Sequence, residues 1–505
     1  MSYLVGLPIA LPLFGAALSI AVGRSRAAQR AIGLVVLTTV SVVSVALLVR
    51  VDDEGIVAIQ AGGWPAPIGI TLVADRLAAI MLTVAALMLL AVLVYAIGQP
   101  GAERNHVGFH PVYLVLAAGV SASFLTGDLF NLFVSFEVTL TASYVLITLG
   151  GRADQVRTGM TYIVISLLAS SLFLISLAFV YSATGTVNMA DLVAKVAELP
   201  GGVRSALALL LIVVFGIKAA IFPLFFWLPD SYPTAPAPVT AVFAGLLTKV
   251  GVYALIRTQT LLFPPETRPG TLLLVVAAAT MLVGVLGAIA QDDIKRILSF
   301  HIVSQIGYMV MGLGLFTVAG LAGAVIYIVH HIVVKTTLFL TAGLVELRAG
   351  TGRLARIGGL AHLVPLMAVL FLLPALSLAG LPPLSGFVAK LALVDAGLDA
   401  GQYAVVAVSL GVSLLTLFSM TKIWTNAFWG EPEVEPDADW ELAIGAERPR
   451  ARALGAPALM IGATAALTAL SIAIAVAAGP VYELSERAAA DLIDPTIYTT
   501  AVLGP

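Results

Sequence analysis

The sequence predicts an all-α polytopic membrane protein of about 14 transmembrane helices, because apolar runs long enough to cross a ~30 Å hydrocarbon core recur along it. Of its 505 residues, 60% are hydrophobic and only 11% are charged, whereas about a quarter of residues are charged in soluble domains. Prolines interrupt two of the apolar runs, and lysines lie within several of them. These features predict broken helices and buried cations.

The composition excludes several classes of site and partner. The chain has no cysteine, which rules out disulfides, thiolate metal sites and cysteine nucleophiles. Its net charge is -2 and it has no basic tract, so nucleic acid is not expected as a partner. The sequence has no cofactor-binding fingerprint, and no cofactor is expected. The first apolar run continues to about Val22 without a basic leader, which favours a first helix over a cleaved signal.

The distribution of basic residues predicts how the chain is oriented. One set of alternate loops holds about twice as many lysines and arginines as the other set. Arg257 is counted in the less basic set. Because basic loops stay on the inner side of the membrane, both termini are predicted to face outward. The remaining basic residues lie within apolar helices, and they are Lys218, Lys249, Lys335, Lys390 and Lys422.

The first predicted unit, residues 1–108, contains helices one to three and an outer hairpin. In residues 56–74, β-branched runs flank a Gly-Gly-Trp-Pro turn, which is typical of a short hairpin. Asp75 and Arg76 begin the third helix, and we expect them to form a solvated pair at the membrane boundary.

A carboxylate lies deep in the fifth predicted helix, residues 129–149. Glu137 is about nine residues into this span, which at ~1.5 Å per residue places it near the middle of the bilayer. An ionised carboxylate at that depth needs a cationic partner, and Lys218 is the candidate. The alternative is a protonated glutamic acid bonded to a helix backbone.

The seventh and eighth predicted helices each carry a lysine, and the seventh is interrupted. Lys218 comes five residues before Pro223, and Lys249 lies in the next apolar helix. A charge at the bilayer centre costs roughly 2.5–3.5 kcal/mol on the insertion scale. Proline also leaves the carbonyl of Ala219 without its helical donor, and free backbone at this depth survives only where protein or water lines it. The segment predicts an ion pathway; the alternative is a packed proline kink with snorkelling lysines.

The eleventh predicted helix carries one polar stripe. Tyr327, His331 and Lys335 follow one another at intervals of four residues, so they share a helix face. Histidine titrates nearest physiological pH, which suits a proton relay between lysines. A structural stripe bonded to a neighbouring helix is the alternative. In the tenth helix, His301 and Gln305 share a face. This pair could hold a row of water molecules or form hydrogen bonds with a neighbouring helix, and the sequence does not decide between the two roles.

The twelfth predicted helix repeats the proline interruption, with Pro383 preceding Lys390. The spacing of lysines recurs as well: Lys218 and Lys249 are 31 residues apart, and Lys390 and Lys422 are 32 apart. Helices seven and eight are therefore predicted to correspond to helices twelve and thirteen.

This recurrence predicts two inverted five-helix repeats with broken helices seven and twelve, since an odd number of helices reverses across the membrane. The repeats are residues 109–265, with helices four to eight, and residues 266–430, with helices nine to thirteen. Residues 431–505 are predicted to form a charged inner loop, helix fourteen and an outer tail. Lys422 lies near a helix end, so the alternative to a role like that of Lys249 is a side chain that extends to the membrane interface.

At these motifs the chain resembles the antiporter-like membrane subunits shared by complex I and the Mrp-type multisubunit cation/proton antiporters. The resemblance covers roughly residues 60–430. It rests on Glu137, Lys218 before FPLFFWLPDSYPTAPAPVTA, Lys249 in LLTKVGVYAL, DDIKRILSF, HIVVKTTLFLTAG and LAGLPPLSGFVAKL. The segments GDLFNLFVSFEVTLTASYVLITLGG and GGWPAPIGITLVAD, together with the chain length, look most like the D subunits of the Mrp antiporters.

The resemblance implies a proton-translocating subunit of a Na+/H+ antiporter, a multi-pass protein of the bacterial plasma membrane in complex with the A, B, C, E, F and G subunits. It also implies a midplane proton relay formed by Glu137, Lys218, Lys249, His331, Lys335 and Lys390. Lys390 stands where some complex I relatives have glutamate, so this end of the relay could differ. Two alternatives are a proton-pumping subunit of an NADH:quinone oxidoreductase and a non-conducting scaffold subunit.

Overall fold

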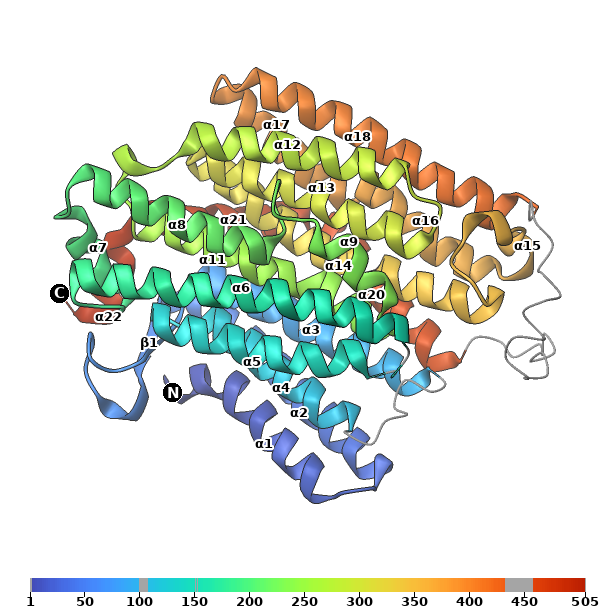
Figure 1. Cartoon of the computed structure of the whole chain (residues 1–505), viewed down its shortest axis with the longest axis horizontal. Coiled ribbons are helices and arrows are strands. Elements are labelled where there is room, and N and C mark those ends of the chain that lie inside the picture. The colour runs from blue at the N-terminus through green and yellow to red at the C-terminus, as the bar shows by residue number, and fades with distance from the viewer. Residues whose placement is uncertain (1, 100–107, 150, 152, 432–456, 505) are drawn as a thin grey trace.

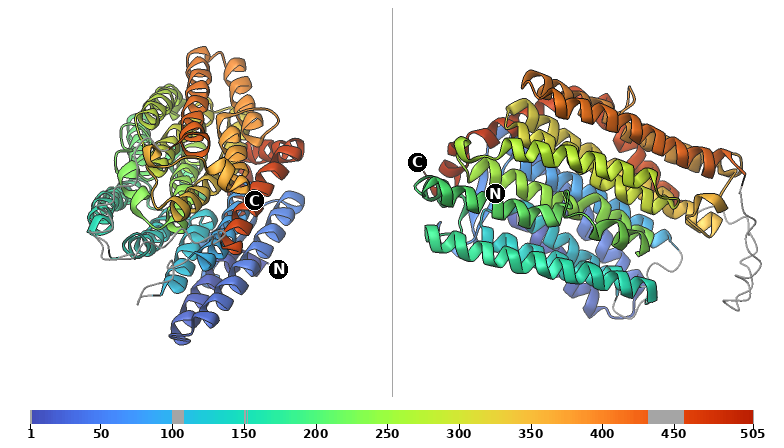
Figure 2. Two further views of the ribbon diagram at one scale, coloured as in Figure 1. Left: turned by 90° about the vertical axis from the view of Figure 1, so that its right-hand side faces the viewer. Right: turned by 45° about the horizontal axis from the view of Figure 1, so that its top comes forward.

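The computed structural model describes residues 2–99, 108–149, 151, 153–431 and 457–504. Its long helices run in roughly the same direction (Figure 1), and a view along them places the N-terminal helices at one edge of the bundle (Figure 2). Within the described ranges, 12 helices are long and apolar enough to cross a membrane. The protein is therefore an all-helical, multi-pass membrane protein. The predicted charged loop lies outside the described residues from position 432 to its end.

The N-terminal part contains four long helices and a hairpin. The two strands pair antiparallel, with Val57 opposite Ala74, which confirms the hairpin predicted from the sequence. The elements in order are η1 (Ser2–Gly6), α1 (Leu7–Ala21), α2 (Arg26–Glu54), β1 (Val57–Gln60), η2 (Ala61–Gly63), β2 (Thr71–Ala74), α3 (Arg76–Gly98) and α4 (Phe109–Leu125).

The middle of the chain contains the first interrupted helix. The elements are α5 (Leu129–Thr148), α6 (Ala153–Thr184), α7 (Met189–Ala197), α8 (Gly201–Ala219), α9 (Trp227–Ser231), η3 (Tyr232–Thr234), α10 (Ala237–Val242), η4 (Phe243–Leu247), α11 (Thr248–Leu261) and η5 (Pro265–Thr267). The turn η4 is π-helical, and α10, η4 and α11 together form one apolar span.

The C-terminal part contains the second interrupted helix and a short helical tail. The elements are α12 (Gly270–Ile289), α13 (Ile294–Leu315), α14 (Val318–Ala349), η6 (Leu354–Arg356), α15 (Leu360–Leu363), α16 (Pro365–Ala379), α17 (Ser385–Asp399), α18 (Tyr403–Ile423), η7 (Trp424–Trp429), α20 (Ala458–Val476), α21 (Ala478–Ile493) and α22 (Pro495–Leu503).

The first predicted interruption is present between α8 and α9. The left-handed residue Ala220, with φ 59°, ends α8 and lets the N–H of Ile221 donate to the carbonyl of Gly216 at 3.1 Å. This is a Schellman-type helix end, which satisfies carbonyls that the helix leaves free. The chain thus leaves the helix three residues before Pro223.

The second interruption, between α16 and α17, has the same construction. Gly380 is left-handed with φ 92°, and the N–H of Leu381 donates to the carbonyl of Leu376 at 3.1 Å. The chain again leaves the helix three residues before a proline, here Pro383. Both broken helices therefore end in the same hydrogen-bonded motif.

Helix α14 lies at the centre of the bundle. Every residue from Gly320 to Val345 is buried. This helix packs against α3, α13, α16, α17, α20 and α21. Polar groups on α14 are consequently shielded by protein on all sides.

Both chain termini lie at the same end of the helices, together with the hairpin, α7 and α22 (Figure 1). We call this end the terminal face, and we call the other end, which carries α15, the opposite face.

Candidate functional site

The carboxylate of Glu137 on α5 and the ammonium of Lys218 on α8 lie on either side of one hydroxyl. Lys218 Nζ donates to Ser170 Oγ at 3.3 Å, and Ser170 Oγ donates in turn to Glu137 Oε1. Lys218 Nζ is also 3.5 Å from the carbonyl oxygen of Ser166. The structure therefore brings the two predicted partners together through a bridging serine and not as a direct ion pair.

Sequence reasoning missed the polar residues that supply this bridge. Tyr162, Ser166 and Ser170 follow one another at intervals of four residues on α6, so they share one face. This is the same spacing as that of the polar stripe on α14. A search for polar residues at this spacing, in place of a search for charges alone, would have found the α6 stripe.

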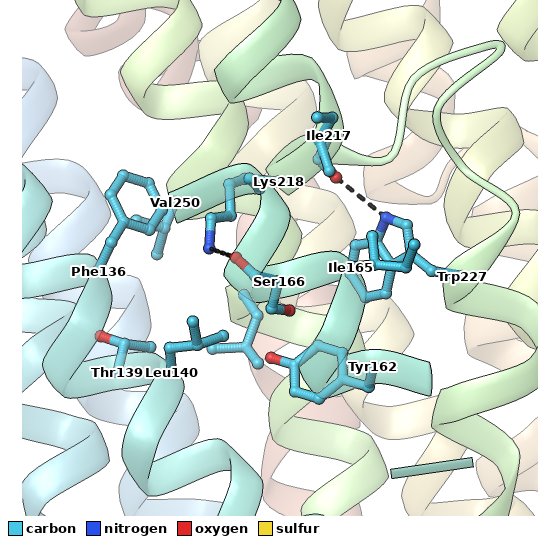
Figure 3. Close-up of a pocket in the computed structure, with 12 residues that line it drawn as sticks. Phe136, Thr139, Leu140, Tyr162, Ile165, Ser166, Ile217, Lys218, Trp227 and Val250 are labelled. Carbon is cyan, nitrogen blue, oxygen red and sulfur yellow. Dashed lines mark hydrogen bonds between the residues drawn. The ribbon is translucent and has the colours of Figure 1, made fainter. Parts of the chain in front are cut away.

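A small cavity adjoins Lys218. It has a volume of about 30 Å³ and is lined by residues that include Phe136, Tyr162, Ser166 and Lys218 (Figure 3). A polar cavity needs roughly 10–15 Å³ to hold one water molecule. The wall of the cavity is mainly apolar, and Lys218, Ser166, Thr139 and Tyr162 supply its few polar groups.

Lys249 is fully buried at the start of α11. Its Nζ donates to the carbonyl of Ala244 at 2.5 Å and to Thr248 Oγ1 at 3.2 Å. Ala244 lies in the π-helical turn η4, and π-turns, whose hydrogen bonds span five residues, are frequent at functional sites. Gly251 brings α11 against α8, since an added Cβ would lie 2.8 Å from the carbonyl carbon of Lys218.

His331 and Lys335 are both completely buried on α14. Lys335 Nζ donates to the carbonyl of Leu298 at 2.9 Å. Neither ring nitrogen of His331 has a hydrogen-bond partner among the described residues, although His331 lies within electrostatic range of Lys249 and Lys335. Buried polar atoms are normally hydrogen-bonded, so these nitrogens mark a place where water is expected.

Lys390 on α17 lies beside the second interruption. Its Nζ donates to the carbonyl of Ala379, the last residue of α16, at 3.0 Å and to Ser413 Oγ at 3.0 Å. The Ala379 carbonyl is free to accept because α16 ends at this residue and the chain leaves the helix at Gly380. The Tyr308 hydroxyl is 2.9 Å from the same Ser413 oxygen, and Lys390 Nζ is 4.9 Å from the Tyr308 ring centroid. Ser413 was not predicted from the sequence.

Aromatic rings connect this lysine with the stripe on α14. Tyr308 and Tyr327 stack with ring centroids 5.2 Å apart, and Tyr327 and His331 stack at 6.4 Å. The Tyr327 hydroxyl donates to Gln305 Oε1. His301 bonds Ser419 Oγ at 2.9 Å. Gln305 and His301 therefore both make interhelical hydrogen bonds, and each keeps one nitrogen without a partner among the described residues.

Two charged groups from the sequence analysis lie apart from these clusters. Lys422 Nζ pairs with Asp292 at 2.8 Å near the opposite face. Asp75 is only 2% exposed and pairs with Arg257 at 2.6 Å, so the prediction of a solvated pair with Arg76 is wrong for Asp75. Arg257, which was counted as a loop residue, lies in α11. Asp75 and Arg257 are buried because α3, α11 and the C-terminal helices pack together, and this packing could not be predicted from the local sequence.

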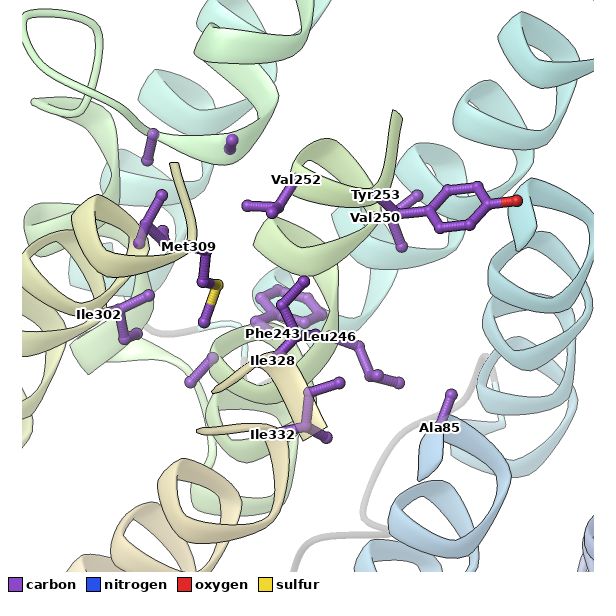
Figure 4. Packing of buried hydrophobic residues seen from close by; sticks show 14 of the residues in the cluster. Ala85, Phe243, Leu246, Val250, Val252, Tyr253, Ile302, Met309, Ile328 and Ile332 are labelled. Carbon is purple, nitrogen blue, oxygen red and sulfur yellow. The ribbon is translucent and has the colours of Figure 1, made fainter. Parts of the chain in front are cut away.

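Apolar side chains pack at the junction of η4 and α11 with α13 and α14. Figure 4 shows Leu246, Ile328, Ile332 and Met309 meeting there. In the part of the chain that the structure describes, no group of three or more histidine and acidic residues could hold a metal ion.

Comparison with known proteins identifies a family. Residues 126–416 match the model of the transmembrane "NADH:quinone oxidoreductase/Mrp antiporter" family. The chain is 46% identical to the D subunit of a Na(+)/H(+) antiporter of Alkalihalophilus pseudofirmus and 37% identical to that of Bacillus subtilis, and both matches cover 100% of each protein.

Solved structures agree with this match. The fold is similar to a chain in the structure of the Mrp complex from Dietzia sp. DQ12-45-1b, with a TM-score of 0.91, 39% identity and coverage of 100% of this chain and 99% of the other. It is also similar to a chain of the archaeal membrane-bound sulfane sulfur reductase, with a TM-score of 0.86, 26% identity and coverage of 100% of both chains.

Proposed function

Because the chain belongs to the NADH:quinone oxidoreductase/Mrp antiporter family, we propose that it moves protons through a relay of buried side chains as the D subunit of a Na+/H+ antiporter. It is a transporter subunit of the Mrp complex and not an enzyme. The relay consists of Glu137, Lys218, Lys249, His331, Lys335 and Lys390.

One observation carries this proposal. The ammonium groups of four lysines in the membrane-spanning bundle donate to hydroxyls and main-chain carbonyls, and none has a carboxylate within ion-pair distance among the described residues. They are Lys218, Lys249, Lys335 and Lys390. A charge taken out of water without a counter-ion is costly. Such lysines can therefore alternate between charged and neutral forms, which a proton carrier must do.

The order of the residues across the bundle supports a lateral path. The path begins where Lys218 contacts the serines of α6. Gly251 brings α11, which carries Lys249, against α8, which carries Lys218. Helix α14, with His331 and Lys335, packs against both η4, which precedes α11, and α17. The apolar junction beside Lys249 is where we expect hydration to control the transfer, since apolar constrictions gate by dewetting.

We also infer that residues 109–265 and 266–430 are inverted repeats. Asp128 caps α5 and Asp293 caps α13, and each forms an antiparallel bridge to a residue after the next long helix, Asn188 or Arg353. The two long helices, α6 and α14, have 32 residues each. The shared end motif of the two broken helices supports the same correspondence.

The orientation and the partners follow from the family and from the loops. Both termini face the outside of the bacterial plasma membrane, because the basic loops belong to the opposite face. The chain works beside the A, B, C, E, F and G subunits, and Na+ or another monovalent cation is exchanged for protons by the complex.

The test is Glu137→Ala in the assembled complex. In everted vesicles, Na+-dependent collapse of a pH gradient should fall to below about a tenth of the wild-type rate, a loss of ~1.4 kcal/mol or more in transition-state stabilisation. Glu266→Ala is the matched control, because Glu266 is exposed and pairs with Arg204 away from the lysines. Wild-type exchange in vesicles that contain normal amounts of the Glu137→Ala complex would falsify the assignment.

A growth experiment separates this function from a redox pump. A deletion strain should be sensitive to Na+ at alkaline pH while its membranes oxidise NADH at the normal rate. Loss of NADH oxidation with unchanged Na+ tolerance would instead favour the oxidoreductase role.

A further inference from the structure

Helix α11 carries a second set of polar residues that points from Lys249 toward the terminal face. Lys249, Tyr253 and Arg257 follow one another at intervals of four residues, so they share one face of the helix. Eight residues at ~1.5 Å each separate Lys249 from Arg257 by about 12 Å along the axis. This stripe is the direct route by which a proton on Lys249 could reach the terminal face.

A buried ion pair occupies the outer end of the stripe. Arg257 lies 2.6 Å from Asp75, and the two side chains are only 4% and 3% exposed. The guanidinium carbon is 5.4 Å from the Tyr253 ring centroid and 5.3 Å from that of Tyr498, which belongs to the C-terminal helix α22. Asp75 also caps α3 by accepting from the N–H of Ala78 at 2.8 Å. Both charges are therefore held in place from several sides.

The middle residue of the stripe cannot pass a proton on in this arrangement. The Tyr253 hydroxyl donates to the carbonyl of Phe124 at 2.7 Å and accepts from Arg257 at 3.3 Å. Figure 4 shows this hydroxyl pointing away from the apolar cluster around Leu246 and toward neighbouring helices. A main-chain carbonyl does not take up the proton, and arginine keeps its own proton at any pH the protein meets. The hydrogen-bonded chain thus ends in groups that do not exchange protons.

We propose that Asp75, Tyr253 and Arg257 form a seal that closes Lys249 off from the terminal face and so confines protons to the lateral path. The inference rests on the proposed function of Lys249 as a relay group. The seal works because the Tyr253 hydroxyl donates to a main-chain carbonyl and Arg257 keeps its own proton, so neither group passes a proton on. Asp75 neutralises the pair so that it can be buried, and Tyr498 covers it from the side of α22.

If the ion pair only stabilised the fold, removing it would not change the proton permeability of the assembled complex. If it forms a seal, removing it should let protons leak across the membrane. Removing one partner would leave an unpaired buried charge and could prevent folding. The test therefore uses double substitutions in the assembled complex. Asp75→Asn with Arg257→Gln removes both charges but keeps polar groups that can hold water. Asp75→Leu with Arg257→Met, the matched control, removes both charges and fills the space of the ion pair with apolar side chains.

The measurement is proton entry into proteoliposomes without Na+, driven by a potassium diffusion potential and followed with an internal pH dye. The amide pair should leak faster than the wild type by about tenfold, equivalent to ~1.4 kcal/mol in the barrier, because its polar groups can hold water that connects Lys249 with the terminal face. The leucine and methionine pair should admit protons no faster than the wild type. Adding Lys249→Ala to the amide pair should return the rate of proton entry to the wild-type value.

Two results would overturn the seal. One is an amide-pair complex, assembled in normal amount, that is as tight as the wild type. The other is a leak that persists unchanged after Lys249→Ala, because the leaking path would then not involve Lys249. Failure of the relay itself is recognised separately, as full Na+/H+ exchange by the single Lys249→Ala variant.

Discussion

The Ser170 hydroxyl lies between the Lys218 ammonium and the Glu137 carboxylate, accepting from the former at 3.3 Å and donating to the latter. A hydroxyl that accepts one hydrogen bond and donates another can pass a proton by exchanging the two. The carboxylate and the amine are thereby coupled without the strong mutual attraction of a direct ion pair, which would hold the lysine in its charged form.

Ser170→Ala should therefore disconnect Glu137 from Lys218. We expect Na+/H+ exchange in vesicles to fall about tenfold, equivalent to ~1.4 kcal/mol, with normal assembly, and Ser170→Thr to retain most of the activity. Ser171→Ala is the matched control, because the Ser171 hydroxyl is exposed and donates to the carbonyl of Leu167 on its own helix. Equal activity of the two alanine variants would show that the bridge is not used.

Replacing a relay lysine by arginine should block exchange nearly as well as alanine does. Arginine holds its proton with a pKa above about 12, so it preserves the charge but cannot alternate. The substitutions are Lys218→Arg, Lys249→Arg and Lys390→Arg, assayed in vesicles that contain equal amounts of complex. Lys422→Arg, at the Asp292 pair, is the control and should remain active. If an arginine variant at a relay position keeps its activity, the lysine at that position supplies a fixed charge and does not need to release its proton.

His331→Ala should interrupt the lateral path at its centre. Its ring nitrogens have no partner among the described side chains and main-chain groups, so the loss should leave folding largely intact. We expect overall exchange to fall by about tenfold or more, the equivalent of ~1.4 kcal/mol. Ile332→Ala, the next residue, controls for the lost volume. Full activity of His331→Ala would leave a single-site exchanger at Glu137 and Lys218.

Asp128 should make the stability of the complex depend on pH. Burial raises the pKa of the Asp128 carboxyl. Hydrogen bonds from the N–H groups of Asn131 and Phe130 lower this pKa, but their effect is smaller than that of burial. A carboxyl with a raised pKa stabilises the fold below its ordinary pKa, and this contribution is lost as the pH rises through the raised value. Asp128→Asn keeps the helix cap without the charge, so the melting temperature should vary less with pH.

Asp128→Ala separates the cap from the charge. Relative to Asp128→Asn, it should lower stability by about 1 kcal/mol through loss of the cap on α5, and by the same amount at every pH because neither variant carries a titrating group at this position. A melting curve for Asp128→Asn that follows the wild-type pH dependence would show that another group is responsible.

The sequence by itself determined which segments are helices, where two of them break and which charges lie within apolar helices. These features are local: hydropathy sets the spans, Pro223 and Pro383 exclude continued helix, and Glu137 and the lysines stand out because charges in apolar runs are costly.

Only the tertiary structure decided which groups meet. Ser170 and Ser413 do not stand out in the sequence, because a serine in a helix usually bonds its own backbone, and both become bridges only when a second helix brings a lysine within reach. The pairing of Asp75 with Arg257 depends in the same way on how α3 and α11 pack. Partner choice across helices is set by interhelical packing, to which residues distant in the chain contribute and which no local pattern encodes.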